Sequence, residues 1–165
     1  MRSAVWIVLG CMMCGALFQS AVGQPASTSQ SVTLTVSPIA RISVSGDPGA
    51  MTISTGTAGS DNLAYAGDSA TTYSITHNSN SNLRITAAID AALSAGYSLS
   101  LRLASTRGSS AGFVDISSAT SAVDVVTGIA RGADAGEIIT YRFNALASSG
   151  AMAATTRTVT LTITN

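Results

Sequence analysis

His77 is the only histidine in the chain, so proton transfer by an imidazole near neutral pH would depend on this residue alone. A nucleophilic triad would need His77 beside a serine and an aspartate, with the aspartate orienting the ring. His77 instead continues the alternation of Tyr73 and Ile75 and then enters a turn, which predicts a half-buried histidine at the end of a strand. We therefore expect no catalytic residue and no enzymatic activity.

The eight acidic residues are the next candidates for chemistry. A glycosidase needs two carboxylates about 5–10 Å apart, and the spacing of these acids indicates no such pair. The Asp-x-Asp-x-Asp-Gly ladder of a calcium loop is absent, although Asp61 and Asp68 flank a loop that contains glycine. We expect no metal and no cofactor. Tyr65 is the aromatic residue of that loop that is free to meet a ligand, so Asp61, Tyr65 and Asp68 are candidates for a ligand-binding loop.

Four arginines lie in or beside runs of alternating apolar residues. Arg84, Arg102 and Arg142 each lie between two apolar residues that we expect to face inward, so their side chains should point outward from mid-strand. Arg157 is similarly placed. Together the four define a candidate outward cationic face that would suit stacking of one subunit on another. The alternative is that they protect sheet faces and edges against aggregation.

The composition limits the partners of the protein. Charged residues make up 10% of the chain, no lysine occurs, and the formal net charge is zero. Electrostatic binding of nucleic acid or anionic lipid requires a positive excess, so we expect neither partner. Apolar residues make up 46% of the chain and recur periodically, which favours a folded domain over a disordered chain.

Residues 1–23 have the three parts of a secretory signal peptide. Arg2 is followed by an apolar run over residues 4–18 and by a small-x-small triplet before Gln24. We expect cleavage before Gln24 and a mature chain without cysteine, because Cys11 and Cys14 lie in the apolar run. An uncleaved membrane anchor and a lipoprotein acylated at Cys11 are the alternatives. The predicted protein is secreted (extracellular, at the cell surface or periplasmic) with no stable membrane insertion after cleavage.

Alternation of apolar with hydroxyl residues dominates the rest of the chain, and a period of two is typical of strands with one buried face. Residues 24–30 are expected to be a flexible lead-in, and residues 31–165 a single domain. The segment His77–Leu83 is interpreted as a hairpin loop and residues 133–136 as a turn. The predicted fold is all-β: a two-sheet antiparallel β-sandwich, immunoglobulin-like or pilin-like, with about 8–10 short strands. Clear strand patterns cover residues 32–36, 73–77, 83–89, 97–103, 139–145 and 159–163, and weaker ones cover 41–45, 50–54, 113–117 and 122–127.

The closing segment, in which threonines separate Val159, Leu161 and Ile163, resembles the final strand of secreted immunoglobulin-like and pilin-like bacterial surface domains. The resemblance covers this one strand. The disulfide usual in chaperone-assembled pilins is absent, and the Asp-x-Gly-x-Tyr pattern of a tyrosine corner is not met, because Tyr141 follows Asp134 too late. No family is assigned on this resemblance.

These observations predict a non-enzymatic, secreted structural or cell-surface protein, such as a matrix, fibre or coat (filament) subunit that assembles through β-strand addition. The candidate assembly strand is Ser31–Val36, in which Val32, Leu34 and Val36 alternate with hydroxyl residues. Such a strand either closes its own sheet or completes a neighbour's. The expected partners are further copies of this chain or other surface proteins. The alternative function is an extracellular carbohydrate- or ligand-binding module that uses the loop around Tyr65.

Overall fold

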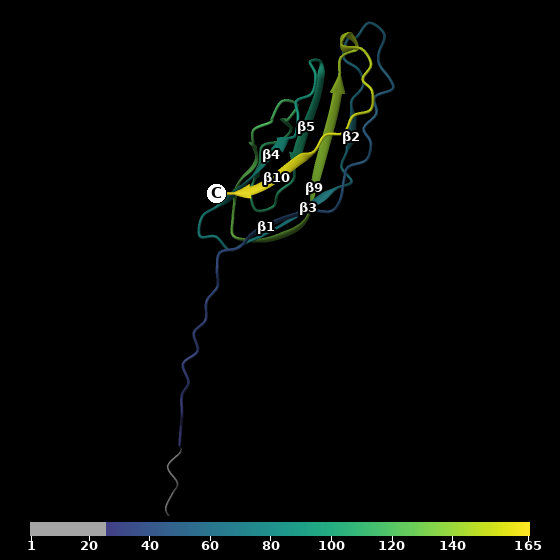
Figure 1. Cartoon of the computed structure of the whole chain (residues 1–165). Coiled ribbons are helices and arrows are strands. Elements are labelled where there is room, and N and C mark those ends of the chain that lie inside the picture. The colour runs from purple at the N-terminus through teal and green to yellow at the C-terminus, as the bar shows by residue number, and fades with distance from the viewer. Residues whose placement is uncertain (1–25) are drawn as a thin grey trace, which may run out of the picture. The chain divides into compact units, whose positions relative to one another are not determined.

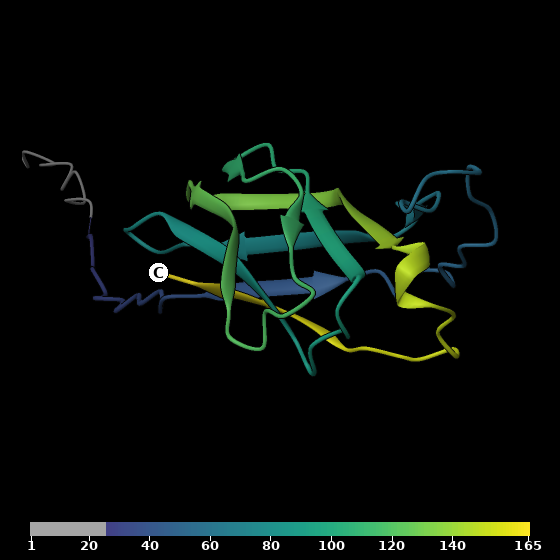
Figure 2. The same ribbon diagram turned by 90° about the horizontal axis from the view of Figure 1, so that it is seen from above.

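A computed structural model describes residues 26–165 (Figure 1). The predicted signal peptide, residues 1–23, lies outside the described residues. Residues 36–165 form one compact unit, and residues 26–35 belong to a separate unit, 1–35. The second unit consists of two antiparallel sheets packed face to face, seen from above in Figure 2. The predicted two-sheet β-sandwich is therefore confirmed.

Ten strands and one short 3-10 helix make up this unit. The first sheet has the order β1-β3-β9-β5-β7, and β2 also pairs with β9; the second has the order β10-β4-β8-β6. All pairs are antiparallel. The strands of the first sheet are β1 (Ala40–Val44), β2 (Ala66–Asp68), β3 (Thr72–His77), β5 (Tyr97–Leu103), β7 (Val114–Asp115) and β9 (Gly132–Ala145). Those of the second are β4 (Leu83–Ile89), β6 (Ser109–Ser110), β8 (Val123–Ile129) and β10 (Val159–Thr164), and the 3-10 helix is Ala147–Ser149.

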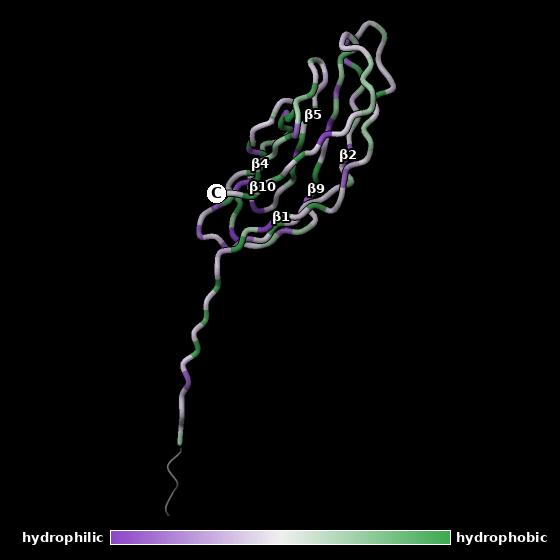
Figure 3. Tube along the Cα trace, viewed as in Figure 1, coloured by the Kyte–Doolittle hydropathy of each residue, from purple (hydrophilic) through white to green (hydrophobic). Residues whose placement is uncertain are grey.

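The core lies between the sheets and is built from the inward halves of the alternating patterns. In β4 and β5 every second residue is buried, among them Ile85 and Leu101, while Arg84 and Arg102 remain exposed. Apolar and polar bands alternate along the strands in Figure 3. Burying each such Leu or Ile contributes about 1.5–3 kcal/mol relative to exposure, so the alternation is the main physical reason for the sandwich.

Three local expectations within residues 36–165 were wrong. Residues 50–54 are not a strand. The segment His77–Leu83 is not a hairpin loop, because β3 and β4 belong to different sheets and the loop carries the chain from one to the other. Residues 133–136 are not a turn but part of β9, where the register against β3 shifts between Tyr73 and Ile75. Gly136 has a φ of 72° at this bulge. Gly136 therefore marks a bulge inside a strand. A sequence pattern cannot distinguish such a bulge from a turn.

The two longer edge strands, β1 and β10, lie on the same side of the sandwich. The sheets end at β7 and β6 on the other side, each of only two residues, whereas β1 has five residues and β10 has six. Figure 2 shows β1 and β10 running beside each other, and they are in contact. Very short edge strands protect a sheet against further pairing, so this form of protection is found on the β6–β7 side only.

Candidate assembly site

The segment Ser31–Val36 is not a strand in the structure, and the first strand begins only at Ala40. The exposed fractions of Val32, Leu34 and Val36 are 74%, 85% and 82%. The expected alternation is therefore present, but within the described chain its apolar row is uncovered and its backbone has no ladder partner. An alternating pattern specifies which side chains share a face, whereas a strand also needs a neighbouring backbone to accept its hydrogen bonds.

The chain just after this segment is held firmly by Asn78. Its side-chain Oδ1 accepts a hydrogen bond from the Ile39 backbone N–H at 2.6 Å, and its Nδ2 donates to the Ser37 carbonyl at 2.9 Å. The Asn78 backbone N–H also donates to the Ile39 carbonyl at 3.1 Å. These three bonds fix residues 37–39, which include Pro38, directly before β1. Sequence reasoning assigned Asn78 only to a turn and so missed this anchor.

β10 pairs only with β4 among the described strands, and its six-residue register has no shift. The Thr158 carbonyl accepts a hydrogen bond from the Asp90 N–H at 3.0 Å. Because backbone groups alternate sides along a strand, the threonines of β10 direct their N–H and C=O groups toward β4. Those of Val159, Leu161 and Ile163 then point to the open edge. The side chains of the same three residues pack against the core but are only half-buried.

The facing edge strand, β1, also presents an incompletely covered inner row. Ala40, Ile42 and Val44 lie opposite the buried residues His77, Ile75 and Tyr73, so they are on the inner face of their sheet. Yet Val44 is 53% exposed and Ile42 is half-buried. We call the strip between the inner rows of β1 and β10 the seam. The seam is apolar and is open to solvent along one side.

The predicted arginines lie on different sheets. Arg84 is on β4 and forms an exposed ion pair with Asp124 at 3.6 Å. Arg157 precedes β10 and is half-buried, with its guanidinium donating to Thr155 and to the Thr156 carbonyl. Arg102 and Arg142, in contrast, occupy adjacent strands, β5 and β9. The structure brings only this last pair together on one sheet.

Arg102 and Arg142 are joined by two exposed aromatic rings in what we call the guanidinium–aromatic row. The guanidinium carbon of Arg142 is 4.7 Å from the ring centroid of Tyr65 and 4.1 Å from that of Phe113, and Arg102 lies 5.3 Å from Phe113. Such contacts contribute about 0.5–1 kcal/mol each at exposed sites. Tyr65 comes from one loop and Phe113 from another, so no spacing in the sequence indicated the row.

The loop acids serve the fold. The Asp61 carboxylate accepts from the Ser148 N–H at 2.7 Å and from the Ser148 hydroxyl at 2.9 Å, which tethers the 3-10 helix. Asp68 accepts from the N–H groups of Ala70 and Gly49. Of the three ligand-loop candidates, Tyr65 and Asp61 are exposed, with Tyr65 61% exposed, and Asp68 is half-buried. No group of three or more His, Cys, Asp or Glu side chains within residues 26–165 is arranged to hold a metal ion.

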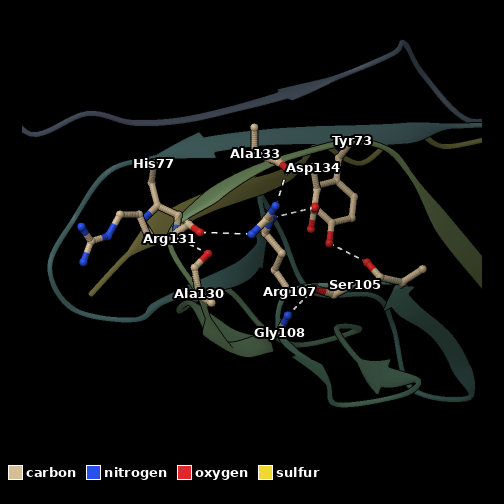
Figure 4. Close-up of polar contacts among 10 residues, drawn as sticks. Tyr73, His77, Ser105, Arg107, Gly108, Ala130, Arg131, Ala133 and Asp134 are labelled. Atoms are coloured by element: carbon tan, nitrogen blue, oxygen red, sulfur yellow. Dashed lines mark hydrogen bonds and ion pairs between the residues drawn. The ribbon is translucent and has the colours of Figure 1, made fainter.

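His77 belongs to a polar cluster at one end of the sandwich (Figure 4). The imidazole is 2% exposed, and its Nε2 lies 2.9 Å from the Ala130 carbonyl oxygen. Arg107 joins its own loop to the start of β9 and to the connection before it. Its Nε contacts the Asp134 carboxylate at 2.9 Å and its Nη1 donates to the Arg131 carbonyl at 3.1 Å. His77 is thus more buried than the half-buried residue expected, and this cluster ties loops together rather than facing a pocket.

Buried Tyr73 completes the cluster. Its hydroxyl donates to the Ala104 carbonyl at 2.5 Å. Burial raises the pKa of the Tyr73 phenol to about 12, because the phenolate would lose its hydration inside the sandwich.

One serine match to a hydrolase pattern occurs in the sequence, Gly108-Ser109-Ser110-Ala111-Gly112. A nucleophile elbow places the serine on a sharp strand-to-helix turn. Ser110 instead lies exposed in the two-residue edge strand β6, and its hydroxyl accepts from the Gly112 N–H. The pattern is therefore not an elbow in this fold.

Comparison with known proteins adds no relative: no protein-family model matches the chain, and no curated protein or solved structure is significantly similar to it. In residues 26–165 there is no helix long and apolar enough to cross a membrane.

Proposed function

We propose that this protein is a secreted, non-enzymatic structural subunit that assembles by β-strand addition, with Ser31–Val36 as the strand that is donated. The observation that carries the proposal is the uncovered row of Val32, Leu34 and Val36. Leaving three such side chains in water forgoes about 1.5–3 kcal/mol each compared with burial. A partner that supplies a sheet edge would cover the row and pair the backbone at the same time.

The position of the segment supports the same proposal. The three hydrogen bonds with Asn78 hold residues 37–39 against the domain. The C-terminal end of the segment is therefore attached to a fixed point directly before β1. Anchoring lowers the entropy lost when a donor strand is captured, because fewer residues must be ordered. The near-neutral, hydroxyl-rich surface also favours packing of like subunits, since charge repulsion between copies is small.

The proposal is tested by placing a charge on each face of the segment in turn. Leu34→Lys puts an ammonium group in the apolar row and should abolish assembly, because an unpaired charge is costly to bury. Thr33→Lys is the matched control, since the residue 33 side chain points to the opposite face, and it should assemble nearly as well as the natural chain. Light scattering and electron microscopy of the mature protein provide the readout. Equal assembly by both variants would exclude the segment as the donor.

Secretion is tested separately. The exported form should begin at or within a few residues of Gln24, and mass spectrometry of its N-terminus measures this directly. An exported chain that retains Met1 would contradict the signal-peptide part of the proposal but not strand addition.

A ligand-binding function is supported by one observation, the exposed Tyr65 ring backed by Arg142. Exposed aromatic faces stack on sugars and cations. Glycan binding that is lost in Tyr65→Ala, in a protein that stays monomeric at all concentrations, would favour this second function over assembly.

A further inference from the structure

From the structure we infer where the donated strand docks: Ser31–Val36 of one copy adds to the free edge of β10 of a second copy, antiparallel, with its apolar row in the seam. The inference rests on the proposed function and deepens it by naming the acceptor edge and the register. Leu34 lies opposite Leu161 in this arrangement, and Thr33 lies opposite Thr162.

The choice of β10 follows from a comparison of the strands that have a free edge. β6 and β7 have two residues each and β2 has three, too few to accept a six-residue strand. β1 carries the exposed residue Arg41 at its second position. β10 has six residues without charge, proline, glycine or register shift. Natural sheets use such devices to block edge pairing, and β10 has none of them.

The inner surface beside β10 matches the donor in chemistry. Val159, Leu161 and Ile163 are half-buried although they face inward, and Val44 on the opposite side of the seam is 53% exposed. A strand added at β10 places its inward side chains between these two rows. The donor supplies three apolar side chains at a period of two, the same number and spacing as the inner row of β10.

The register follows from the backbone and from the outer face. The N–H and C=O groups that point to the open edge belong to Val159, Leu161 and Ile163, so these must form the hydrogen-bonded pairs. Pairing them with Val36, Leu34 and Val32 places apolar residues together on the inner face. The same register sets Ser31, Thr33 and Thr35 opposite Thr164, Thr162 and Thr160 on the outer face. Hydroxyl pairs across strands are favourable, and antiparallel pairing is the arrangement of every strand pair in this sheet.

Disulfide trapping tests the register without background, because the only cysteines of the chain, Cys11 and Cys14, precede the predicted mature start. Mature Thr33→Cys protein is mixed with mature Thr162→Cys protein and oxidised. Both positions are exposed, so the substitutions should not disturb the fold. In the inferred register the two residues are a non-hydrogen-bonded pair with close Cβ atoms, and a covalent heterodimer should form.

The matched control is Thr33→Cys mixed with Thr160→Cys, the pair that a parallel strand would bring together. We expect about ten-fold less heterodimer from this control, because a diagonal pair lies beyond the usual reach of a disulfide. More heterodimer from position 160 than from position 162 would overturn the antiparallel register. In the double variant Thr33→Cys/Thr162→Cys, a covalent ladder is expected, whereas a disulfide-closed monomer would show that the strand pairs within its own chain and would overturn exchange.

Failure of the docking site is distinguishable from failure of the proposed function. If assembly depends on Leu34 but no heterodimer forms through position 162, the acceptor is wrong and strand donation stands. If the mature protein stays monomeric at every concentration, or if Leu34→Lys leaves assembly unchanged, both fail.

Discussion

Two six-residue segments with nearly the same sequence pattern adopt different structures in this molecule. Ser31–Val36 reads Ser-Val-Thr-Leu-Thr-Val and β10 reads Val-Thr-Leu-Thr-Ile-Thr. β10 is a strand whose apolar row packs against the core, whereas the apolar row of Ser31–Val36 is exposed and in no strand. Alternation therefore only creates an apolar face, and the availability of a neighbouring sheet edge decides whether this face becomes part of a sheet.

The largest expected difference between the two segments concerns the backbone. Thr162→Pro removes an N–H that faces β4 and should lower the free energy of unfolding by about 3 kcal/mol. Leu34→Pro removes an N–H that has no ladder partner, so it should leave the stability of the monomer unchanged. Urea unfolding of both variants at low protein concentration measures the contrast. A loss of similar size in Leu34→Pro would show that the segment is paired within the monomer.

A second prediction concerns the pH dependence of the stability that the core contributes. The Tyr73 pKa is raised to about 12 in the folded state, from an ordinary value of 10.0. The unfolded chain therefore loses this proton first as the pH rises, and the stability contributed by the neutral phenol is fully present below pH 10 and declines between about pH 10 and 12, by about 2–3 kcal/mol in all. Tyr73→Phe should flatten this alkaline decline. Denaturant unfolding at a series of pH values is the measurement, and an equal decline in both proteins would contradict the assignment.

A third prediction compares the truncation of one leucine in each segment, and its expected effect on stability is slightly smaller. Leu161→Ala should cost about 2 kcal/mol of stability, at the low end for a core leucine because the residue is half-buried. Leu34→Ala should change the stability of the monomer by less than about 0.5 kcal/mol but weaken assembly. Unfolding measured beside light scattering gives both quantities. If Leu34→Ala destabilised the monomer as much as Leu161→Ala, the contrast between the segments would disappear.

The smallest expected effect lies outside both segments, in the guanidinium–aromatic row. A double-mutant cycle with Arg142→Gln and Tyr65→Leu should give a coupling of about 0.5–1 kcal/mol, as expected for an exposed cation–π contact. Assembly should be unaffected, because neither residue lies on β1 or β10. Loss of assembly in Arg142→Gln would move the interface to this face of the first sheet.

The alternating patterns predicted the long central strands but missed the short strands β2 and β6 and the first half of β9. The expected ranges 83–89 and 97–103 coincide with β4 and β5, because in the middle of a sheet both the side-chain pattern and the backbone partners are present. The same patterns failed where the presence of a neighbouring strand decides whether a segment becomes a strand. They placed a strand over residues 50–54, where the structure has none.

For the same reason, only part of the candidate site could be predicted from the sequence. The apolar row of Val32, Leu34 and Val36 is a property of the chain itself and was visible. The openness of β10 depends on sheet order, and the anchoring by Asn78 depends on a loop that connects two sheets. Both bring together residues far apart in the sequence, and no local pattern records such contacts.

Amide hydrogen exchange of the mature protein over a range of concentrations shows whether Ser31–Val36 is a donated strand. The amides of Val32, Leu34 and Val36 should exchange rapidly in the dilute monomer and become protected as assembly proceeds. The Leu161 amide, which faces the open edge of β10, should gain protection over the same concentration range. Protection of the three segment amides at the lowest concentration, or rapid exchange in the assembled protein, would contradict the claim that this segment is a donated strand.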